Sequence, residues 1–138
     1  MTTSSQVFSW PVRVYVEDTD FGGVVFYANY LKYFERARTE LLRSVGVTQH
    51  SMVDEHQVIF VVTSAAVDYV APARMDEELR VTAVVEKLGR ASVKFTQEVW
   101  CGTSLLAKAK IAIACVSIES MRPQPIPEDL FEKLRESS

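Results

Sequence analysis

Residues 14–30 read VYVEDTDFGGVVFYANY, and this stretch decides how the rest of the chain is organised. Its first residues alternate as in a strand, two glycines then predict a turn, and an aromatic helical pattern follows. A strand, a glycine turn and a helix N-terminus placed together can present one carboxylate beside free backbone N–H groups. This arrangement suits an acyl-transfer site, where one group attacks and another holds the developing oxyanion.

A long helix is predicted over residues 28–45, because apolar residues recur there with a helical period. The apolar stripe comprises Tyr30, Phe34, Ala37, Leu41 and Val45, and it is widened by Tyr33 and Leu42. The remaining positions carry the charged residues Lys32, Glu35, Arg36, Arg38, Glu40 and Arg43. Arg36 and Glu40 have the spacing of a helical ion pair, and Gly46 is well placed to end the helix. A stripe this wide indicates a helix that other elements largely cover.

Five strands are predicted from alternating or continuous apolar patterns. They cover residues 7–16, 58–70, 79–88, 92–101 and 105–118. In the first strand Val12, Val14 and Val16 share one face, and Pro11 places the strand at a sheet edge or delays its start. The linkers between the last four strands are short enough for hairpins. This order predicts an α+β fold in which a mostly antiparallel sheet wraps one long helix.

The length of 138 residues predicts a single domain over residues 1–138, in which residues 1–5 are disordered. Residues 48–56 fit a short helical turn or a loop, and residues 127–136 fit a short C-terminal helix. The net charge of -3 gives no electrostatic case for nucleic acid or an anionic membrane. No secretory signal and no apolar run of about 20 residues is present. Cys101 and Cys115 are interpreted as buried, reduced thiols of a cytoplasmic protein.

The acidic cluster from Glu17 to Asp20 allows several interpretations. A solvated turn is the simplest, because Asp and Thr favour turns and helix caps. A calcium loop is excluded, because its fifth and twelfth positions would be Gly22 and Asn29. A phosphate-transferring aspartate would need parallel βαβ units that the chain does not supply. His50 and His56 lack a partner motif and are interpreted as exposed residues, so no metal site is expected.

Three stretches carry a resemblance to a known family. They are Asp18–Tyr30, Phe34–Glu40 and Val67–Asp76. Together they resemble the hot-dog-fold thioesterases of the 4-hydroxybenzoyl-CoA thioesterase family. Within that family the chain is most similar to bacterial acyl-CoA thioesterases associated with the Tol–Pal system. The resemblance covers nearly the whole chain and implies a curved sheet of about five strands around a central helix. It also implies a homodimer that pairs through residues 58–70; dimers of dimers are common in the family, so a homotetramer is expected as well, while the choice between dimer and tetramer stays open.

The resemblance also implies an active site in the opening stretch. Asp20 would be the catalytic carboxylate, and the backbone N–H of Tyr27 would polarise the thioester carbonyl. Gly22 and Gly23 would permit close approach of the backbone. Many of the nearest relatives carry histidine where this chain has Tyr27, and tyrosine cannot act as a base near neutral pH. Asp20 would therefore work with backbone dipoles alone, as nucleophile or as general base.

The substrate would occupy two regions. Phe26, Tyr30 and the edge strand of a partner subunit would line an apolar acyl channel. The phosphates of coenzyme A would meet a basic hairpin formed by Lys87, Arg90, Ser92 and Lys94. Coenzyme A would be part of the substrate, and no metal or further cofactor is implied.

The leading hypothesis is therefore an acyl-CoA thioesterase that releases free acid and coenzyme A. A second hypothesis is a non-hydrolytic protein that binds acyl-CoA or an acyl carrier protein and serves envelope or lipid-synthesis proteins. A hot-dog dehydratase is disfavoured, because that chemistry usually needs a histidine in this motif. Acyl chain length, aromatic or aliphatic preference, and the acyl donor stay open.

Overall fold

The computed structural model describes residues 7–137 and shows one antiparallel sheet with a long helix against it. The five strands are β1 (Phe8–Arg13), β2 (Val58–Tyr69), β3 (Glu78–Leu88), β4 (Ser92–Cys101) and β5 (Ser104–Ser117). The helices are α1 (Tyr30–Ser44), α2 (Gln49–His56) and α3 (Glu128–Ser137), with short 3₁₀ turns η2 (Val16–Asp18) and η3 (Tyr27–Asn29). The expected disorder of residues 1–5 lies outside the described residues.

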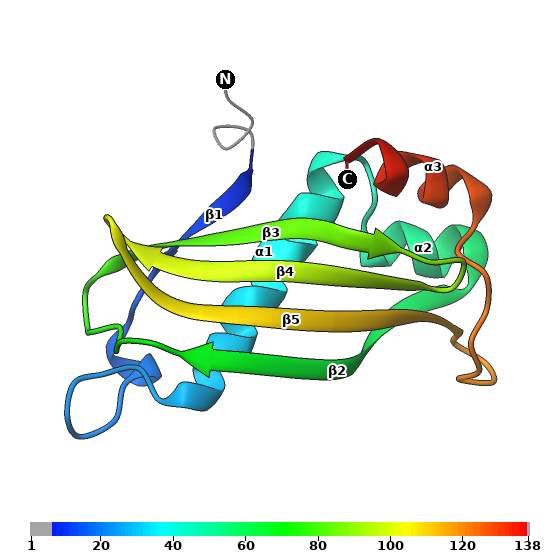
Figure 1. Cartoon of the computed structure of the whole chain (residues 1–138). Coiled ribbons are helices and arrows are strands. Elements are labelled where there is room, and N and C mark those ends of the chain that lie inside the picture. The colour runs from blue at the N-terminus through cyan, green and yellow to red at the C-terminus, as the bar shows by residue number, and fades with distance from the viewer. Residues whose placement is uncertain (1–6, 138) are drawn as a thin grey trace.

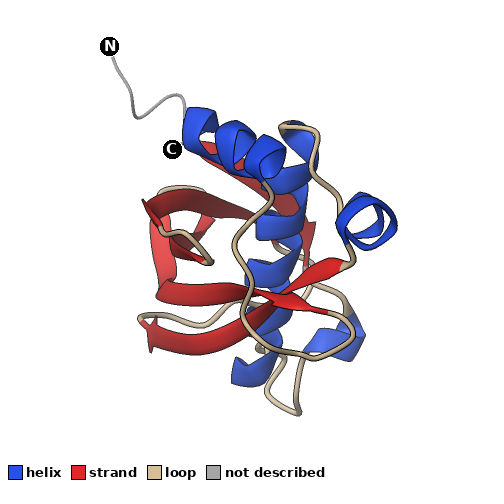
Figure 2. Cartoon of the chain, turned by 90° about the vertical axis from the view of Figure 1, so that its right-hand side faces the viewer, coloured by secondary structure: helices blue, strands red, loops and turns tan. Residues whose placement is uncertain are grey.

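The sheet curves around α1, which runs across its concave face (Figures 1 and 2). The strand order is β1-β3-β4-β5-β2, and every pair of neighbours is antiparallel. The expected α+β hot-dog architecture of five strands around a central helix is confirmed. None of the helices within residues 7–137 is both long and apolar enough to span a membrane.

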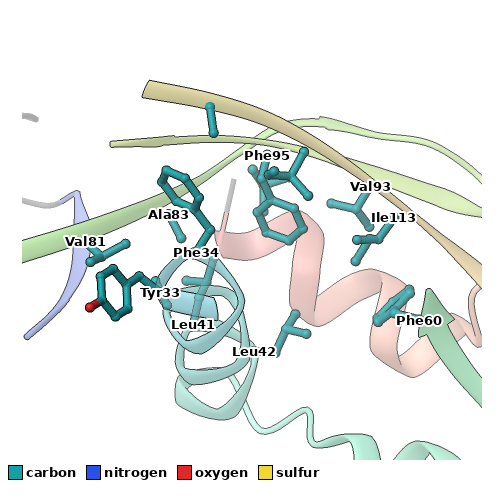
Figure 3. Close-up of a cluster of buried hydrophobic side chains, with 14 of the residues drawn as sticks. Tyr33, Phe34, Leu41, Leu42, Phe60, Val81, Ala83, Val93, Phe95 and Ile113 are labelled. Atoms are coloured by element: carbon teal, nitrogen blue, oxygen red, sulfur yellow. The ribbon is translucent and has the colours of Figure 1, made fainter. Parts of the chain in front are cut away.

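The core lies between α1 and the concave face of the sheet (Figure 3). Tyr33, Phe34 and Ala37 of α1 are fully buried, and Phe95 and Val81 face them from the sheet. Each large apolar side chain buried in this way contributes about 1.5–3 kcal/mol relative to exposure. The apolar stripe that the sequence predicted on this helix is thus the face that packs against the sheet.

Strand pairing departs from the expected hairpins at one connection. The β3–β4 and β4–β5 connections are hairpins, but β2 pairs with β5 and not with β3. The expectation of a hairpin after β2 is therefore wrong. Residues 70–77 instead run under the loop before α1, where Val25 N–H donates to the Ala73 carbonyl at 2.8 Å. A short linker permits a hairpin but does not require one, because its backbone N–H and C=O groups can also be paired with groups elsewhere in the chain.

Three expectations about single side chains are also corrected. The first strand ends at Arg13, so Val16 lies in a 3₁₀ turn and is 69% exposed rather than facing the core. Arg38 is buried, although its position on the helix suggested a solvated charge. Glu40 pairs with Arg43 at 3.3 Å rather than with Arg36.

Most other local expectations agree with the structure. Pro11 lies in β1, which is an edge strand as expected. Gly46 follows α1 with φ +86°, the left-handed conformation that ends many helices. Residues 48–56 resolve into the helix α2, whose N-terminus Thr48 caps by accepting from Ser51 N–H at 3.0 Å. His56 is only partly exposed and lies 3.4 Å from Asp129.

Phe34→Ala should lower the free energy of unfolding by about 3–5 kcal/mol, because it leaves a cavity between α1 and the sheet. Urea denaturation of the variant and the wild type measures this difference. Leu31→Ala, on the same helix but 44% exposed, is the matched control and should cost about 1 kcal/mol or less. Equal losses in the two variants would contradict the packing described here.

Candidate active site

The loop between β1 and α1 is closed by its own backbone hydrogen bonds. Asp20 N–H donates to the Val24 carbonyl at 3.0 Å, and Gly23 N–H donates to the Asp20 carbonyl at 3.0 Å. The Asp20 carboxylate accepts from Gly22 N–H at 2.9 Å. Gly23 adopts φ +76°, which favours glycine. The loop is therefore a tight turn that holds Asp20 at an exposed position.

Asp18 and Asp20 have different surroundings, although they are two residues apart. Asp18 is 6% exposed, and its carboxylate accepts from Tyr15 N–H at 2.9 Å. Its carbonyl accepts from Phe26 N–H at 3.0 Å and from the Asn29 side chain at 2.9 Å. Asp18 thus ties the end of β1 to the start of α1, whereas Asp20 is free to meet a ligand. No pattern in the sequence indicated this role of Asp18.

Tyr33 lies beneath this acidic cluster. Burial raises the pKa of the Tyr33 hydroxyl, and the nearby Asp18 carboxylate raises it further. Tyr33 therefore stays protonated at neutral pH.

The N-terminal end of the helix offers unpaired donors. Within the described chain, the backbone N–H groups of Tyr27 and Ala28 make no hydrogen bond to another protein group. They belong to η3, which runs directly into α1. A helix N-terminus carries about half a positive charge and points such groups at an incoming oxygen. Two contacts pair the arms of the loop: Phe26 N–H donates to the Asp18 carbonyl, and Thr19 forms an antiparallel bridge with Val25. Asp20 therefore lies on one arm of this loop and Tyr27 on the other.

Aromatic rings form a wall beside these donors. The centroid of the Tyr27 ring lies 4.8 Å from that of Phe26 and 6.0 Å from that of Tyr69, and the Tyr27 and Tyr69 rings meet edge to face. Tyr69 at the end of β2 donates its hydroxyl to the Tyr27 carbonyl at 3.1 Å. Phe26 and Tyr27 are 47% and 62% exposed. Tyr69 was not singled out from the sequence, although it lies in the stretch that carried the resemblance.

Tyr30 is almost fully buried, so it supports the wall from behind. Its ring packs against Tyr69 at 5.2 Å, and its hydroxyl accepts from Ala73 N–H at 3.0 Å. Burial raises the pKa of Tyr30, which keeps the hydroxyl neutral. Tyr30 therefore fixes residues 70–77 against α1.

The basic hairpin lies far from Asp20 within one chain. Tyr69 beside the loop pairs with Ala107, whereas Ser92 pairs with Ala114 of the same strand β5. Seven residues of extended strand span about 23 Å. Figure 1 shows the β3–β4 turn and the loop before α1 at opposite ends of the sheet. A single chain therefore does not bring Lys87, Arg90, Ser92 and Lys94 to Asp20.

The strand β2 forms the second edge of the sheet and is open to solvent. Within residues 7–137 it pairs with β5 alone, and residues 62–66 are all exposed. A bulge interrupts the pairing between Val62 and Ser64. An exposed, long edge strand is a surface on which another strand can add.

The chain is similar in sequence to known proteins over most of its length. The model of the thioesterase superfamily matches residues 22–108, which is more than half of the chain. The chain belongs to the thioesterase superfamily. It is 45% identical to the acyl-CoA thioesterase YbgC of Haemophilus influenzae over 89% of this chain and 90% of that protein. It is 38% identical to the acyl-CoA thioester hydrolase YbgC of Escherichia coli, over 96% and 99% of the two chains.

The solved structures agree with this assignment. A probable thioesterase from Bartonella henselae has a TM-score of 0.84 and 34% identity, and the match covers 88% of this chain and 99% of that one. The resemblance to hot-dog thioesterases that the sequence indicated is confirmed, as is the expectation of a thioesterase-family enzyme.

Asp18→Ala should lower the free energy of unfolding by about 1–3 kcal/mol, because it leaves Tyr15 N–H without its acceptor in a partly buried site. Asp20→Ala should leave stability close to that of the wild type, because Asp20 is exposed. Urea denaturation of the two variants measures the difference. Equal stability of the two variants would show that Asp18 does not hold the loop.

Proposed function

We propose that this protein hydrolyses acyl-CoA thioesters to a free acid and coenzyme A. The observation that carries the proposal is the exposed carboxylate of Asp20 on the same loop as the unpaired N–H of Tyr27, at the N-terminal end of α1. The names of the thioesterase relatives support acyl-CoA as the substrate class.

Thioester hydrolysis does not need a strong general acid. A thiolate leaving group has a pKa near that of cysteine, about 8.5, so it departs without strong protonation. The main requirement is to stabilise negative charge on the carbonyl oxygen as the tetrahedral centre forms. Tyr27 N–H would donate to this oxygen, and the dipole of α1 would add to the stabilisation.

Asp20 would supply the attack in one of two ways. As a nucleophile, its carboxylate oxygen would bond to the carbonyl carbon, expel the thiolate and leave a mixed anhydride that water then hydrolyses. As a general base, it would take a proton from a water that attacks the same carbon, while the electrons of the C–S bond leave with sulfur. Gly22 and Gly23 leave room for the acyl group beside the loop, because neither carries a side chain.

The acyl group would begin its path at the aromatic wall. Phe26 and Tyr27 offer exposed apolar surface there, and Tyr69 backs Tyr27. Tyr30 would contribute by position rather than by direct contact, because it is buried in the single chain. This path leads from the helix N-terminus toward the edge strand β2.

The free edge of β2 supports a homodimer in which two copies pair through residues 58–70. Antiparallel pairing would put the start of the partner's β2 beside the end of this chain's β2. The basic hairpin of the partner would then lie at the end of the joint sheet that holds Asp20. In this arrangement the lysines at 87 and 94 and Arg90 would meet the phosphates of coenzyme A, and Ser92 would add a hydroxyl.

Asp20→Asn should reduce kcat at least a hundredfold, since the amide can neither attack nor accept a proton as the carboxylate does. Thiol release from short, long and aromatic acyl-CoAs measures this loss. Glu17→Gln, an exposed acid of the same loop, is the matched control and should keep most of the activity. Burial raises the pKa of Cys101 and of Cys115, so the protein's own thiols should add little background.

Substantial turnover by Asp20→Asn would refute the role of Asp20. A wild-type protein that binds acyl-CoA without releasing thiol would favour the non-hydrolytic binding function instead.

Ser64→Asp should convert the protein from a dimer to a monomer and abolish most activity, because the new carboxylates would face each other near the axis between two β2 strands. Analytical ultracentrifugation measures the mass. Val84→Asp, on an exposed position of β3 away from the edge, is the control and should stay dimeric. A wild-type monomer with full activity would contradict pairing through β2.

A further inference from the structure

A pocket of about 360 Å³ lies between α1, β2 and β5. Its walls are mostly apolar and come from all three elements: Leu31, Leu42, Phe60, Val62, Ile111 and Ile113. A pocket of this size and lining suits part of a small-molecule ligand. Three charged residues, Lys32, Glu35 and Arg38, also line the pocket, and of these Arg38 is the buried one.

Arg38 lines this pocket and is only 7% exposed. Its guanidinium donates to the Gln97 side-chain oxygen at 3.0 Å. Over residues 7–137, no carboxylate lies within 4.0 Å of the guanidinium to pair with it. A guanidinium has five N–H donors and remains charged in proteins, so a buried one without an anion is costly. Within residues 7–137 only the exposed Glu35 acts on the guanidinium electrostatically, so the burial of Arg38 points to a further anionic group from a ligand or a partner.

The position of Arg38 is fixed by a second buried side chain. Gln97 is fully buried, and its amide nitrogen donates to the Phe34 carbonyl at 3.0 Å and to the Thr82 carbonyl at 3.1 Å. These bonds leave the Gln97 oxygen to accept from Arg38. A cation held in this way is preorganised for an incoming oxygen anion.

The pocket follows the same face of the helix as the proposed reaction site. Leu31, Arg38 and Leu42 recur at helical spacing, and Tyr27 lies four residues before Leu31. Arg38 is eleven residues beyond Tyr27, which corresponds to about 16 Å along a helix axis. An acyl chain whose carbonyl meets Tyr27 N–H and which follows this face would bring its far end to Arg38.

The charges around the pocket favour an anion at that end. Lys32 and Glu35 also line the pocket, but both are exposed at its rim and their charges cancel. Arg38 is the buried charge and leaves the pocket with one net positive charge. Burial lowers the pKa of Arg38, and the charge of the nearby Glu35 carboxylate partly offsets this lowering. The guanidinium therefore stays a cation at neutral pH.

We propose that this pocket selects acyl groups that end in a carboxylate, which pairs with Arg38 at the far end of the chain. This inference rests on the proposed hydrolysis of acyl-CoA. It assigns the substrate class as dicarboxylic acyl-CoA thioesters of a length that spans the distance from Tyr27 to Arg38.

The test measures kcat/KM for two series of substrates of matched chain length. One series consists of CoA monothioesters of dicarboxylic acids, which end in a free carboxylate, and the other of acyl-CoAs that end in a methyl group. The wild type should prefer the carboxylate end by about tenfold or more at one length, as expected for a hydrogen-bonded ion pair. Arg38→Met should lose this preference, and Arg38→Lys should retain part of it. Arg43→Met is the matched control, because Arg43 is an exposed arginine of α1 outside the pocket, and it should keep the preference.

Thermal unfolding of each variant shows whether it is folded, and Arg38→Lys carries the test if Arg38→Met does not fold. Equal kcat/KM for the two series in the wild type would overturn the inference while leaving hydrolysis intact. A wild type without the preference, combined with an Arg38→Met variant that becomes monomeric, would assign Arg38 to a carboxylate of a second copy. No cleavage of any thioester would refute the proposed function itself.

Discussion

The hydrogen bonds of Asp18 hold the loop on which the candidate site depends. The carboxylate of Asp18 binds the backbone of Tyr15, and its carbonyl binds Phe26 and Asn29. The end of one strand and the start of the central helix are thereby fixed relative to each other. Because each net hydrogen bond is worth only about 0.5–1.5 kcal/mol, the loop needs several of them to keep one conformation.

The connection after β2 supplies the remaining bonds. Val25 N–H donates to the Ala73 carbonyl at 2.8 Å, Met75 N–H to the Gly23 carbonyl at 3.1 Å, and Asp76 N–H to the Val14 carbonyl at 3.0 Å. This connection can lie under the loop because β2 pairs with β5 at the far side of the sheet. The same strand order leaves β2 as an open edge. One topological feature therefore both supports the loop and leaves the strand edge on which the proposed second copy would add.

Local patterns in the sequence predicted most of the elements. The strand over residues 92–101 has the predicted bounds, and the helical stripe of α1 is the buried face. These features depend on neighbours in sequence, so a period of two or 3.6 residues reveals them. The strand order was not predictable in this way, because the residues of β2 pair with residues of β5 that lie 38 to 59 positions further along the chain. The roles of Asp18 and Tyr69 depend on contacts of the same non-local kind.

Asp20 and Tyr27 came from the family resemblance rather than from periodicity, and they remain predictions as site residues. The structure adds that Asp20 is exposed and that Tyr27 N–H is unpaired, which composition and spacing could not show. Arg38 was misjudged for a physical reason. An arginine on a helix is usually solvated, and only the shape of the sheet above it decides otherwise.

The exposed aromatic side chains beside Asp20 and the buried Arg38 both depart from the usual placement of their residue types. Asp20 lies among exposed aromatic side chains such as Phe21 and Phe26, and Arg38 lies within an apolar pocket. Neither placement stabilises the single chain, because surface apolar groups and a buried unpaired cation both raise its free energy. Residues that depart from the rules of stable folding in this way mark places where a ligand or partner completes the structure. In the proposed mechanism thioester cleavage uses one acid and a helix N-terminus, so discrimination between acyl groups would come from the pocket beyond them.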